Sequence, residues 1–349
     1  MLGWKRAAHA SRNSSLTSFV SVIVPFRNEA NTLAFLLEDL SKQKYAAFEI
    51  ILVNDHSEDN SLKVISRICE KSSRLKEQVR VVHCTEHSGK KAALTLGIVQ
   101  AKGDIILTTD ADCRVGIEWV ESMLSHFTDN TMMVMGGVRL SASSFFEKLQ
   151  QLEFVSLIGS GAATLGWNLP SMANGANLAY RKIAFEKVGG YAGNEHIPSG
   201  DDEFLLRKIV DQYSEAVRFA DHPTSIVETR PADTLKTFIQ QRLRWAGKWR
   251  MHTGLFSKVL ALSIFFFQLT FLTLPILLMF KIIAWPLALV VMGCKVVGEF
   301  LFLYPVSHKL GVKFPWLAFG ALQFIYPYYV VAVGLLANGS KYTWKGRTF

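Results

Sequence analysis

The sequence is poor in cysteine and in charged residues. Its 349 residues include four cysteines, at positions 69, 84, 113 and 294, and only 19% of the chain is charged. No two cysteines have a CxxC spacing, which argues against a zinc site and favours a reduced, cytosolic setting. The apolar run at 19–25 is too short and too β-branched for a signal peptide. We therefore expect the polar part of the chain to remain in the cytosol.

A compact basic arm with interleaved aromatic residues is also lacking, although the net charge is +9. This absence argues against nucleic-acid binding. The basic residues concentrate instead just before the first long apolar stretch, with Asp233 as the one acid among them: Arg230, Lys236, Arg242, Arg244, Lys248, Arg250 and Lys258. Such a segment is typical of a cytoplasmic flank that faces anionic lipid.

Long apolar stretches are confined to the last part of the chain. Half of all residues are apolar, and the excess lies in three stretches: Val259–Phe280, Ile282–Tyr304 and Phe314–Asn338. Each stretch can cross a hydrocarbon core, which takes about 20 residues. Three such stretches in succession would overfill one soluble core, so the sequence predicts a membrane protein with a large polar part.

Two rules disagree on the side of the C-terminal tail. Three crossings would place the tail outside, whereas its basic residues, among them Lys345, would keep it inside. Lys295 and Glu299, four residues apart in the second stretch, are costly in lipid unless they neutralise each other and face protein or water. We expect one stretch to be re-entrant or interfacial and the tail to be cytoplasmic; three plain spans with an external tail are the alternative.

The polar part alternates between strand patterns and helix patterns. Strand-like runs occupy 18–25, 48–55, 79–84 and 103–110, and helical periods lie between them at 28–43, 60–73 and 90–101. Near-continuous apolar strands separated by helices predict an α/β fold with a parallel sheet covered on both faces. In such sheets ligands bind beyond the carboxyl ends of the strands. The later segment 143–165 leans apolar, and we expect a packed core helix there.

Acidic residues stand at these strand ends. Asp55 ends "ILVND", and Asp110 and Asp112 end "ILTTDAD". A lone DxD is weak evidence, because Asp is common in turns. Three carboxylates at one edge nevertheless repel one another unless a cation compensates, and a hydrated divalent ion shared with a diphosphate would do so. Lys90 begins a helix at a position that suits a phosphate, although a solvated lysine is the plainer interpretation.

Two later motifs also admit two interpretations. In "SGDDEFLLRK" (199–208), consecutive acids can complement a helix dipole or hold a general base at a site. In "FIQQRLRWAGKW" (238–249), Gln241, Arg244 and Trp245 share one helical face. They can bind phosphate and stack on a sugar, or they can form an interfacial helix before a membrane span.

In combination, these segments resemble the family 2 inverting glycosyltransferases of the GT-A fold, particularly membrane-attached bacterial members. "VSVIVPFRNEANTL" resembles the opening nucleotide-binding strand, "ILVNDHSEDNS" the second motif, "SGKKAALTLGI" the GKxxAxNxG segment and "GDIILTTDADC" the DxD strand. "NGANLAYRKIAFEKVGGY" is similar to the acceptor-side loop, "GDDEFL" to the ED motif and "QQRLRW" to the QxxRW motif. The resemblance covers residues 17–250 in the correct order, and this conjunction is far more specific than any single motif.

The resemblance implies a Rossmann-like mixed sheet and a role for each matching residue. Pro25, Glu29, Asp55, Lys90 and Asp110 would bind the nucleotide of a nucleotide diphosphate sugar, most simply a UDP-sugar. Asp112, with Asp110, would hold Mg²⁺ or Mn²⁺. Asp202 would be the catalytic base, with Asp201 where the family usually has Glu. The remaining matches would contact the acceptor or the diphosphate: Asn174, Gly175, Asn177, Gln241, Arg244 and Trp245.

The expected organisation follows from these assignments. We predict a flexible N-terminus at 1–16, a catalytic domain at 17–255, about three membrane helices at 256–338 and a basic tail at 339–349. The predicted protein sits in a bacterial inner membrane, with its catalytic domain in the cytoplasm and a lipid or lipid-linked glycan as acceptor. A catalytically silent scaffold and a processive polysaccharide synthase are the alternatives. Processive members carry membrane helices before the catalytic domain, and no apolar stretch of that length precedes it in this sequence.

Overall fold

The computed structural model describes residues 1–8, 18–85, 88–194, 200–247, 255–337, 343–344 and 347–348. The chain divides into two compact units. Unit 1 comprises residues 1–141 and 157–230, and unit 2 comprises residues 142–156 and 231–349. The two units are described separately below.

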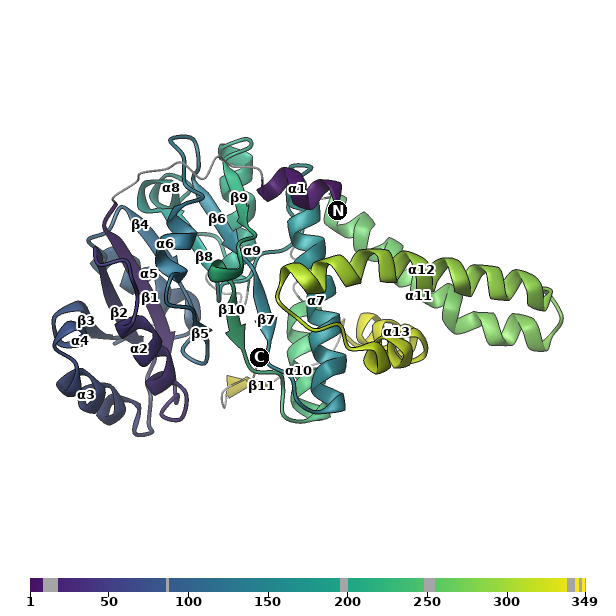
Figure 1. Ribbon diagram of the computed structural model, residues 1–349, viewed down its shortest axis with the longest axis horizontal. Coiled ribbons are helices and arrows are strands. Elements are labelled where there is room, and N and C mark those ends of the chain that lie inside the picture. The colour runs from purple at the N-terminus through teal and green to yellow at the C-terminus, as the bar shows by residue number, and fades with distance from the viewer. Residues whose placement is uncertain are drawn as a thin grey trace. The chain divides into compact units, whose positions relative to one another are not determined.

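Unit 1 is built around a seven-stranded sheet with the strand order β3-β2-β1-β4-β8-β6-β9 (Figure 1). Among these strands β8 alone runs against its neighbours β4 and β6. The strands are β1 (Val20–Phe26), β2 (Phe48–Asn54), β3 (Val79–His83), β4 (Ile105–Thr108), β6 (Met133–Gly136), β8 (Leu178–Arg181) and β9 (Val217–Ala220). The carboxyl ends of the six other strands therefore share an edge with the beginning of β8.

The central strands are buried because helices cover the sheet. Every residue of β2 is buried, as are all residues of β1 except Pro25. Such continuous burial is expected of parallel strands between two helical layers. The helices of unit 1 between the strands are α2 (Leu33–Ser41), α3 (Ser61–Lys71), α4 (Ser73–Gln78), α5 (Lys90–Gln100), α6 (Trp119–Leu124), α8 (Lys182–Lys187) and α9 (Asp201–Gln212). The predicted alternation of strands and helices is confirmed.

The beginning of the chain differs from the prediction of a flexible N-terminus. Residues Leu2–Ala8 form helix α1, and Trp4 is buried with its ring 4.7 Å from that of Phe219. The apolar contact with β9 supplies the free energy that a helix of this length lacks in isolation. Residues 9–16, the rest of that predicted segment, lie outside the described residues.

A small second sheet in unit 1 has the order β5-β10-β7. It consists of β5 (Arg114–Val115), β7 (Val138–Leu140) and β10 (Val227–Thr229), and the 3₁₀ turn η1 (Pro223–Ser225) precedes β10. Its strands follow β4, β6 and β9 along the chain, so each continues from the carboxyl edge of the main sheet. The small sheet thereby fixes the segment that follows the DxD pair.

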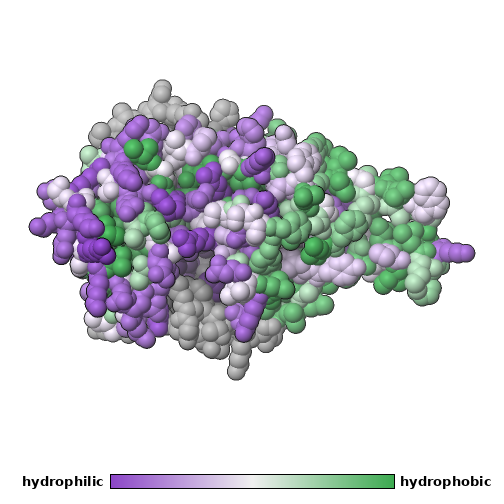
Figure 2. Space-filling model, turned by 60° about the horizontal axis from the view of Figure 1, so that its bottom comes forward, coloured by the Kyte–Doolittle hydropathy of each residue, from purple (hydrophilic) through white to green (hydrophobic). Residues whose placement is uncertain are grey.

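Unit 2 is predominantly helical. Its helices are the first part of α7 (Phe145–Leu165), α10 (Leu235–Ala246), α11 (Leu255–Met279), α12 (Trp285–Lys309) and α13 (Trp316–Leu336). The short strands β11 (Thr343–Trp344) and β12 (Arg347–Thr348) follow them. Helices α11, α12 and α13 are each long and apolar enough to cross a membrane. Figure 2 shows apolar side chains gathered over the α11 and α12 part of this unit.

The charged pair predicted to be costly in lipid is neutralised within unit 2. The Lys295 ammonium lies 2.9 Å from a Glu299 carboxylate oxygen and donates to Oε1 of Gln323 on α13 at 2.7 Å. Gln323 in turn donates through Nε2 to Glu299 at 2.9 Å. The Lys295 side chain is fully buried, as the sequence required of a charge in an apolar helix.

The unit boundaries differ from the predicted domain boundary between residues 255 and 256. Residues 142–156 and 231–247 belong with the apolar helices rather than with the sheet. The reason is a set of contacts among α7, α10 and α13, in which Glu153 pairs with Arg242 and accepts a hydrogen bond from Tyr329.

Candidate functional site

The site of unit 1 lies at the carboxyl edge of the main sheet. Phe26, at the end of β1, is in register with Asn54 at the end of β2, and Asn54 is in register with His83 at the end of β3. The antiparallel β8 begins at this same edge, where Leu178 pairs with Thr108 of β4. The loops after β1, β2 and β4 and the loop before β8 therefore meet.

Hydrogen bonds hold the loop after β1 to the loop after β2. The backbone N–H of Glu29 donates to Oγ of Ser61 at 2.9 Å, and that of Ala30 donates to Oδ2 of Asp59 at 3.0 Å. The Glu29 carboxylate accepts a hydrogen bond from Thr32. These bonds fix Glu29 on the loop after β1, whereas the other predicted nucleoside contact of this segment, half-buried Pro25, lies in β1 itself.

Asp55 joins the end of β2 to the beginning of α5. Its carboxylate is buried and accepts a hydrogen bond from the backbone N–H of Gly89 at 3.0 Å. Gly89 has a φ of 106°, a conformation that only glycine adopts without strain. This bond positions the next residue, Lys90, at the first turn of α5.

Lys90 lies between two of the predicted acidic motifs. Its ammonium is 2.6 Å from Oδ1 of Asp110 and 3.7 Å from Oδ2 of Asp201. Burial by itself would lower the pKa of Lys90, but the two carboxylates outweigh burial and the net shift is upward. The lysine is therefore charged throughout the neutral range, and it compensates Asp110, one of the three strand-end carboxylates, together with Asp201.

Asp202 is oriented by backbone groups. Its Oδ2 accepts from the N–H of Gly175 at 2.9 Å and its Oδ1 accepts from the N–H of Glu203 at 2.7 Å. A Cβ added at Gly175 would lie 3.0 Å from Oδ2 of Asp201 and 3.2 Å from Nζ of Lys90. Gly175 thus allows the loop before β8 to approach both acids of the "GDD" motif and Lys90 at once.

The predicted metal ligands are few. Asp112 is half-buried on the turn that follows β4, and Asp110 is engaged by Lys90. Within the described residues no group of three or more His, Cys, Asp or Glu side chains could hold a metal ion. One or two carboxylates nevertheless fit Mg²⁺ or Mn²⁺, because such ions take their remaining oxygen ligands from phosphates and water.

Two asparagines of the loop before β8 have internal roles. Asn174 accepts from the N–H of Ala176 at 3.0 Å through its side-chain oxygen. Asn177 is fully buried and bonds Trp119, the Gly137 carbonyl and the Ser225 carbonyl at 3.0, 2.8 and 2.7 Å. This differs from the predicted contact of Asn177 with an acceptor, because its amide is already occupied inside the core. Through these hydrogen bonds Asn177 anchors the loop before β8 to the core.

The three remaining predicted residues lie in unit 2, on α10. Gln241, Arg244 and Trp245 are all half-buried. The Oε1 atom of Gln241 accepts a hydrogen bond from Arg242, and the Trp245 ring packs 6.2 Å from that of Phe154. The predicted site residues thus belong to two sets, a cluster at the sheet edge of unit 1 and one face of α10 in unit 2.

Sequence reasoning missed the buried ion pair beside this motif. Arg242 is 4% exposed and Glu153 on α7 is 6% exposed, and the two side chains are paired. The missed signal was the acid at position 153, which stands between Leu152 and Phe154 where the segment turns from polar to apolar. A charge between such apolar neighbours indicates a buried partner.

Comparison with known proteins identifies relatives that match part of the chain. Residues 21–189 match the family model described as Glycosyl transferase family 2. The poly-beta-1,6-N-acetyl-D-glucosamine synthase of Staphylococcus aureus is 27% identical over 235 residues, or 65% of this chain and 53% of that protein. The glycosyltransferase GlyG of Streptococcus pneumoniae is 33% identical over 122 residues, or 35% of this chain and 39% of that protein. The chain thus spans about half the length, or less, of these curated relatives.

A solved structure resembles nearly the whole chain. The mannosyltransferase PcManGT from Pyrobaculum calidifontis, in complex with GDP-Man and Mn²⁺, has a TM-score of 0.60 and covers 97% of this chain and 94% of its own. The two sequences are 17% identical, so the likeness concerns the fold. It confirms the predicted GT-A sheet followed by apolar helices.

Proposed function

Residues 21–189 form a family 2 glycosyltransferase domain, and from this premise we propose that the chain is a membrane-bound inverting glycosyltransferase. It transfers a sugar from a nucleotide diphosphate sugar, in the first instance a UDP-sugar, to a hydroxyl of a lipid or lipid-linked glycan. The catalytic domain lies on the cytoplasmic side of a bacterial inner membrane.

The observation that carries the proposal is the cluster of Lys90, Asp110, Asp201, Asp202 and Gly175 at the carboxyl edge of the sheet. The chemistry needs a base on one side of the anomeric carbon and compensated negative charge on the other. Asp202, held by two backbone N–H groups, takes the proton of the acceptor hydroxyl as its oxygen attacks the anomeric carbon. The bond from that carbon to the diphosphate oxygen breaks, and the configuration inverts.

Besides compensating Asp110 and Asp201, Lys90 has a role in this reaction. Because its ammonium is held between Asp110 and Asp201, it supplies a fixed positive charge at the start of α5, whose N–H groups also favour phosphate. We assign it to the diphosphate of the donor. Gly175 keeps the acceptor-side loop close enough for Asp202 to be oriented by that loop.

The nucleoside is assigned to the loop after β1 and the end of β2. Pro25, Glu29 and Asp55 stand at that edge, and the loops that carry them are joined by hydrogen bonds. A UDP-sugar remains the first choice from the motifs. The neighbour solved with GDP-Man makes GDP-mannose the second donor to test.

A divalent ion, Mg²⁺ or Mn²⁺, fits the oxygen ligands of Asp112 and a diphosphate. When bound, it would stabilise the negative charge on the leaving group. Asp110 would help in two ways, as a second ligand of the ion and by holding the Lys90 ammonium in place. The neighbour PcManGT was solved with Mn²⁺, which supports testing that ion first.

The acceptor is assigned to the membrane. Helices α11, α12 and α13 can hold the chain there, and the segment 230–258 that precedes and enters α11 is basic. Gln241, Arg244 and Trp245 lie in this segment and would contact the acceptor sugar, the lipid head group or the diphosphate. A processive polysaccharide synthase is the second candidate, favoured by the activity in the name of the S. aureus relative.

A donor screen tests the proposal. Purified full-length protein would be incubated with UDP-sugars and GDP-mannose in nanodiscs made from bacterial lipids, with and without Mn²⁺, and products would be read by mass spectrometry. A lipid that gains one hexose or N-acetylhexosamine supports single transfer, and a ladder of products supports the synthase. Efficient transfer to a soluble sugar in lipid-free detergent, with no gain from lipid, contradicts the membrane acceptor. No transfer or donor hydrolysis under any condition supports the silent scaffold.

A further inference from the structure

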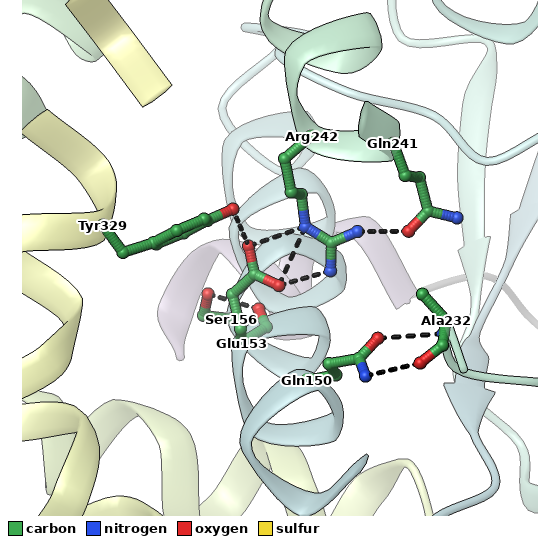
Figure 3. Close-up of polar contacts among 7 residues, drawn as sticks. All are labelled: Gln150, Glu153, Ser156, Ala232, Gln241, Arg242 and Tyr329. Atoms are coloured by element: carbon green, nitrogen blue, oxygen red, sulfur yellow. Dashed lines mark hydrogen bonds and ion pairs between the residues drawn. The ribbon is translucent and has the colours of Figure 1, made fainter. Parts of the chain in front are cut away.

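Unit 2 contains a polar cluster in which only Gln241 has a part in the proposed reaction. Figure 3 shows its members, which come from three helices: Glu153 on α7, Gln241 and Arg242 on α10, and Tyr329 on α13. The Arg242 Nε atom donates to both Glu153 oxygens, at 2.9 and 3.0 Å. Its Nη2 donates to Glu153 as well, so the guanidinium is held in one plane by a bidentate contact.

The carboxylate has a further donor. The Tyr329 hydroxyl donates to Oε1 of Glu153 at 3.0 Å. Burial would lower the pKa of Arg242, but the Glu153 carboxylate outweighs it and the pKa is raised. The Arg242 guanidinium therefore remains charged, and its charge is compensated within the cluster by Glu153.

Arg242 also contacts two residues of the QxxRW motif directly. Its guanidinium lies 4.4 Å from the ring centre of Trp245 and 4.4 Å from that of Phe238. Its Nη1 donates to Oε1 of Gln241. Because a guanidinium only donates, the atom of Gln241 that faces it must be the amide oxygen. The amide NH₂ of Gln241 consequently points away from Arg242, where it can donate to a ligand.

We propose that Arg242 is a positioning residue, clamped by Glu153 and Tyr329, that fixes the side chains of Gln241 and Trp245 for the acceptor. The inference rests on the proposed function for the identity of the ligand. The physical basis of the positioning does not depend on the proposed function. The flat, permanently charged guanidinium of Arg242 is held by Glu153, so it presents one face to the Trp245 ring and one N–H to the Gln241 amide. Through Tyr329 the clamp also ties the motif helix α10 to α13.

If the Glu153–Arg242 pair had only a structural role, a different result would be expected. Replacing a buried ion pair by apolar residues of similar size is often neutral for stability. The double variant Glu153→Leu/Arg242→Met should therefore fold, with a melting temperature close to that of the wild type in nanodiscs. If the pair merely filled the interior, this variant would also transfer sugar normally.

The positioning role forecasts a selective loss. In the double variant we expect kcat/KM for the lipid acceptor to fall at least tenfold, while nucleotide binding changes less than twofold. Tyr329→Phe, which removes one hydroxyl, should produce a smaller loss in the same parameter. Gln150→Met is the matched control, because Gln150 exchanges two buried hydrogen bonds of 2.9 Å between α7 and Ala232 without contacting Arg242. It should leave acceptor kinetics within twofold of the wild type.

A spectroscopic measurement separates this inference from the proposed function. Full-length protein labelled with 5-fluorotryptophan gives a resonance for Trp245 that the Trp245→Phe variant identifies. In the Glu153→Leu/Arg242→Met variant that resonance should move or broaden, and in Gln150→Met it should stay. This outcome supports positioning even if no donor is ever turned over.

Two results would overturn the inference. One is a folded double variant whose Trp245 resonance is unchanged. The other is a folded double variant that transfers to the lipid acceptor within twofold of the wild type.

Discussion

At the scale of single residues, the site is organised by one lysine. Lys90 contacts an acid of the DxD pair and an acid of the "GDD" motif, 2.6 and 3.7 Å away. Its folded pKa is raised, so the stability it contributes is fully present below its ordinary pKa of about 10.4 and is lost only as pH rises through the higher folded value. Lys90 therefore introduces no pH dependence near neutrality.

Asp202→Asn should lower transfer by at least about 100-fold, because the amide cannot accept the proton of the acceptor hydroxyl. Nucleotide binding should survive, since the shape of the side chain is kept. Transfer assays and calorimetric titration with the nucleoside diphosphate measure the two effects. Asp211→Asn, an exposed acid on the same helix, is the control. More than a few per cent of residual transfer would move the role of base to Asp201.

Asp112→Ala should abolish the gain in nucleotide affinity that Mn²⁺ or Mg²⁺ gives the wild type. The reason is that the ion would lose the Asp112 carboxylate as an oxygen ligand and would no longer be held firmly beside the diphosphate. Titrations with and without EDTA measure this directly. Asp104→Ala, at the opposite end of β4, should bind like the wild type. A wild type indifferent to EDTA would refute the metal assignment.

At the scale of elements, the sheet edge depends on a few loops with fixed geometry. The loop after β1 is hydrogen-bonded to the loop after β2. The Asp55 carboxylate accepts a hydrogen bond from the N–H of Gly89, just before α5. Loops normally vary, but side-chain to backbone hydrogen bonds of this kind define a single conformation. Lys90 has a defined position because Gly89, the residue before it, has a φ of 106°, a conformation that glycine adopts without strain.

Gly89→Ala should destabilise the protein by about 1–3 kcal/mol, the usual cost of a side chain in this part of conformational space. No atom lies within 4 Å of the added Cβ, so the effect is a pure backbone effect. We also expect weaker nucleotide binding, because Lys90 would move. Thermal unfolding and nucleotide titration measure the two changes. Gly116→Ala, which would meet only an atom at 3.8 Å and has no positive φ, should be close to neutral.

At the scale of the whole molecule, the apolar helices of unit 2 are not equivalent. In Figure 1 α11 and α12 run side by side, whereas α13 is strongly foreshortened and runs in another direction. The middle of α13 carries Gln323, which bonds the Lys295–Glu299 pair of α12, and Tyr329, which bonds Glu153 of α7. The polar groups at the centre of α13 are thus satisfied by α12 and α7, while Phe324, Ile325 and Tyr328 beside them remain exposed. We propose that α11 and α12 cross the membrane and that α13 lies at its surface.

This arrangement forecasts a tail on the same side as the catalytic domain. In a cysteine-free background, Lys345→Cys should resist an impermeant thiol reagent in intact cells and react after permeabilisation. Lys281→Cys, in the turn between α11 and α12, should react from outside. Labelling of position 345 in intact cells would support three plain spans instead. The structure of residue 345 itself lies outside the described residues.

Local sequence signals determined the chemistry and most of the elements of this protein. Strand and helix periods are short-range properties, and the motif residues Asp55, Asp110, Asp112 and Asp202 were recognisable from a few neighbours each. The three apolar helices followed from length and hydropathy alone. The resemblance then fixed the order of the motifs, because each one occupies a set position along a GT-A sheet.

The tertiary structure alone decided which distant residues meet. Lys90, at the start of α5, joins Asp110, which follows β4, to Asp201, which opens α9. Arg242 meets Glu153 across 89 residues of sequence, and helix α1 exists because Trp4 packs on Phe219. Such contacts have no local signal, since they depend on the order of strands and the packing of helices. That is also why short-range patterns could indicate candidate residues such as Asp110 and Asp202 but could not show that Asn177 lies in the core.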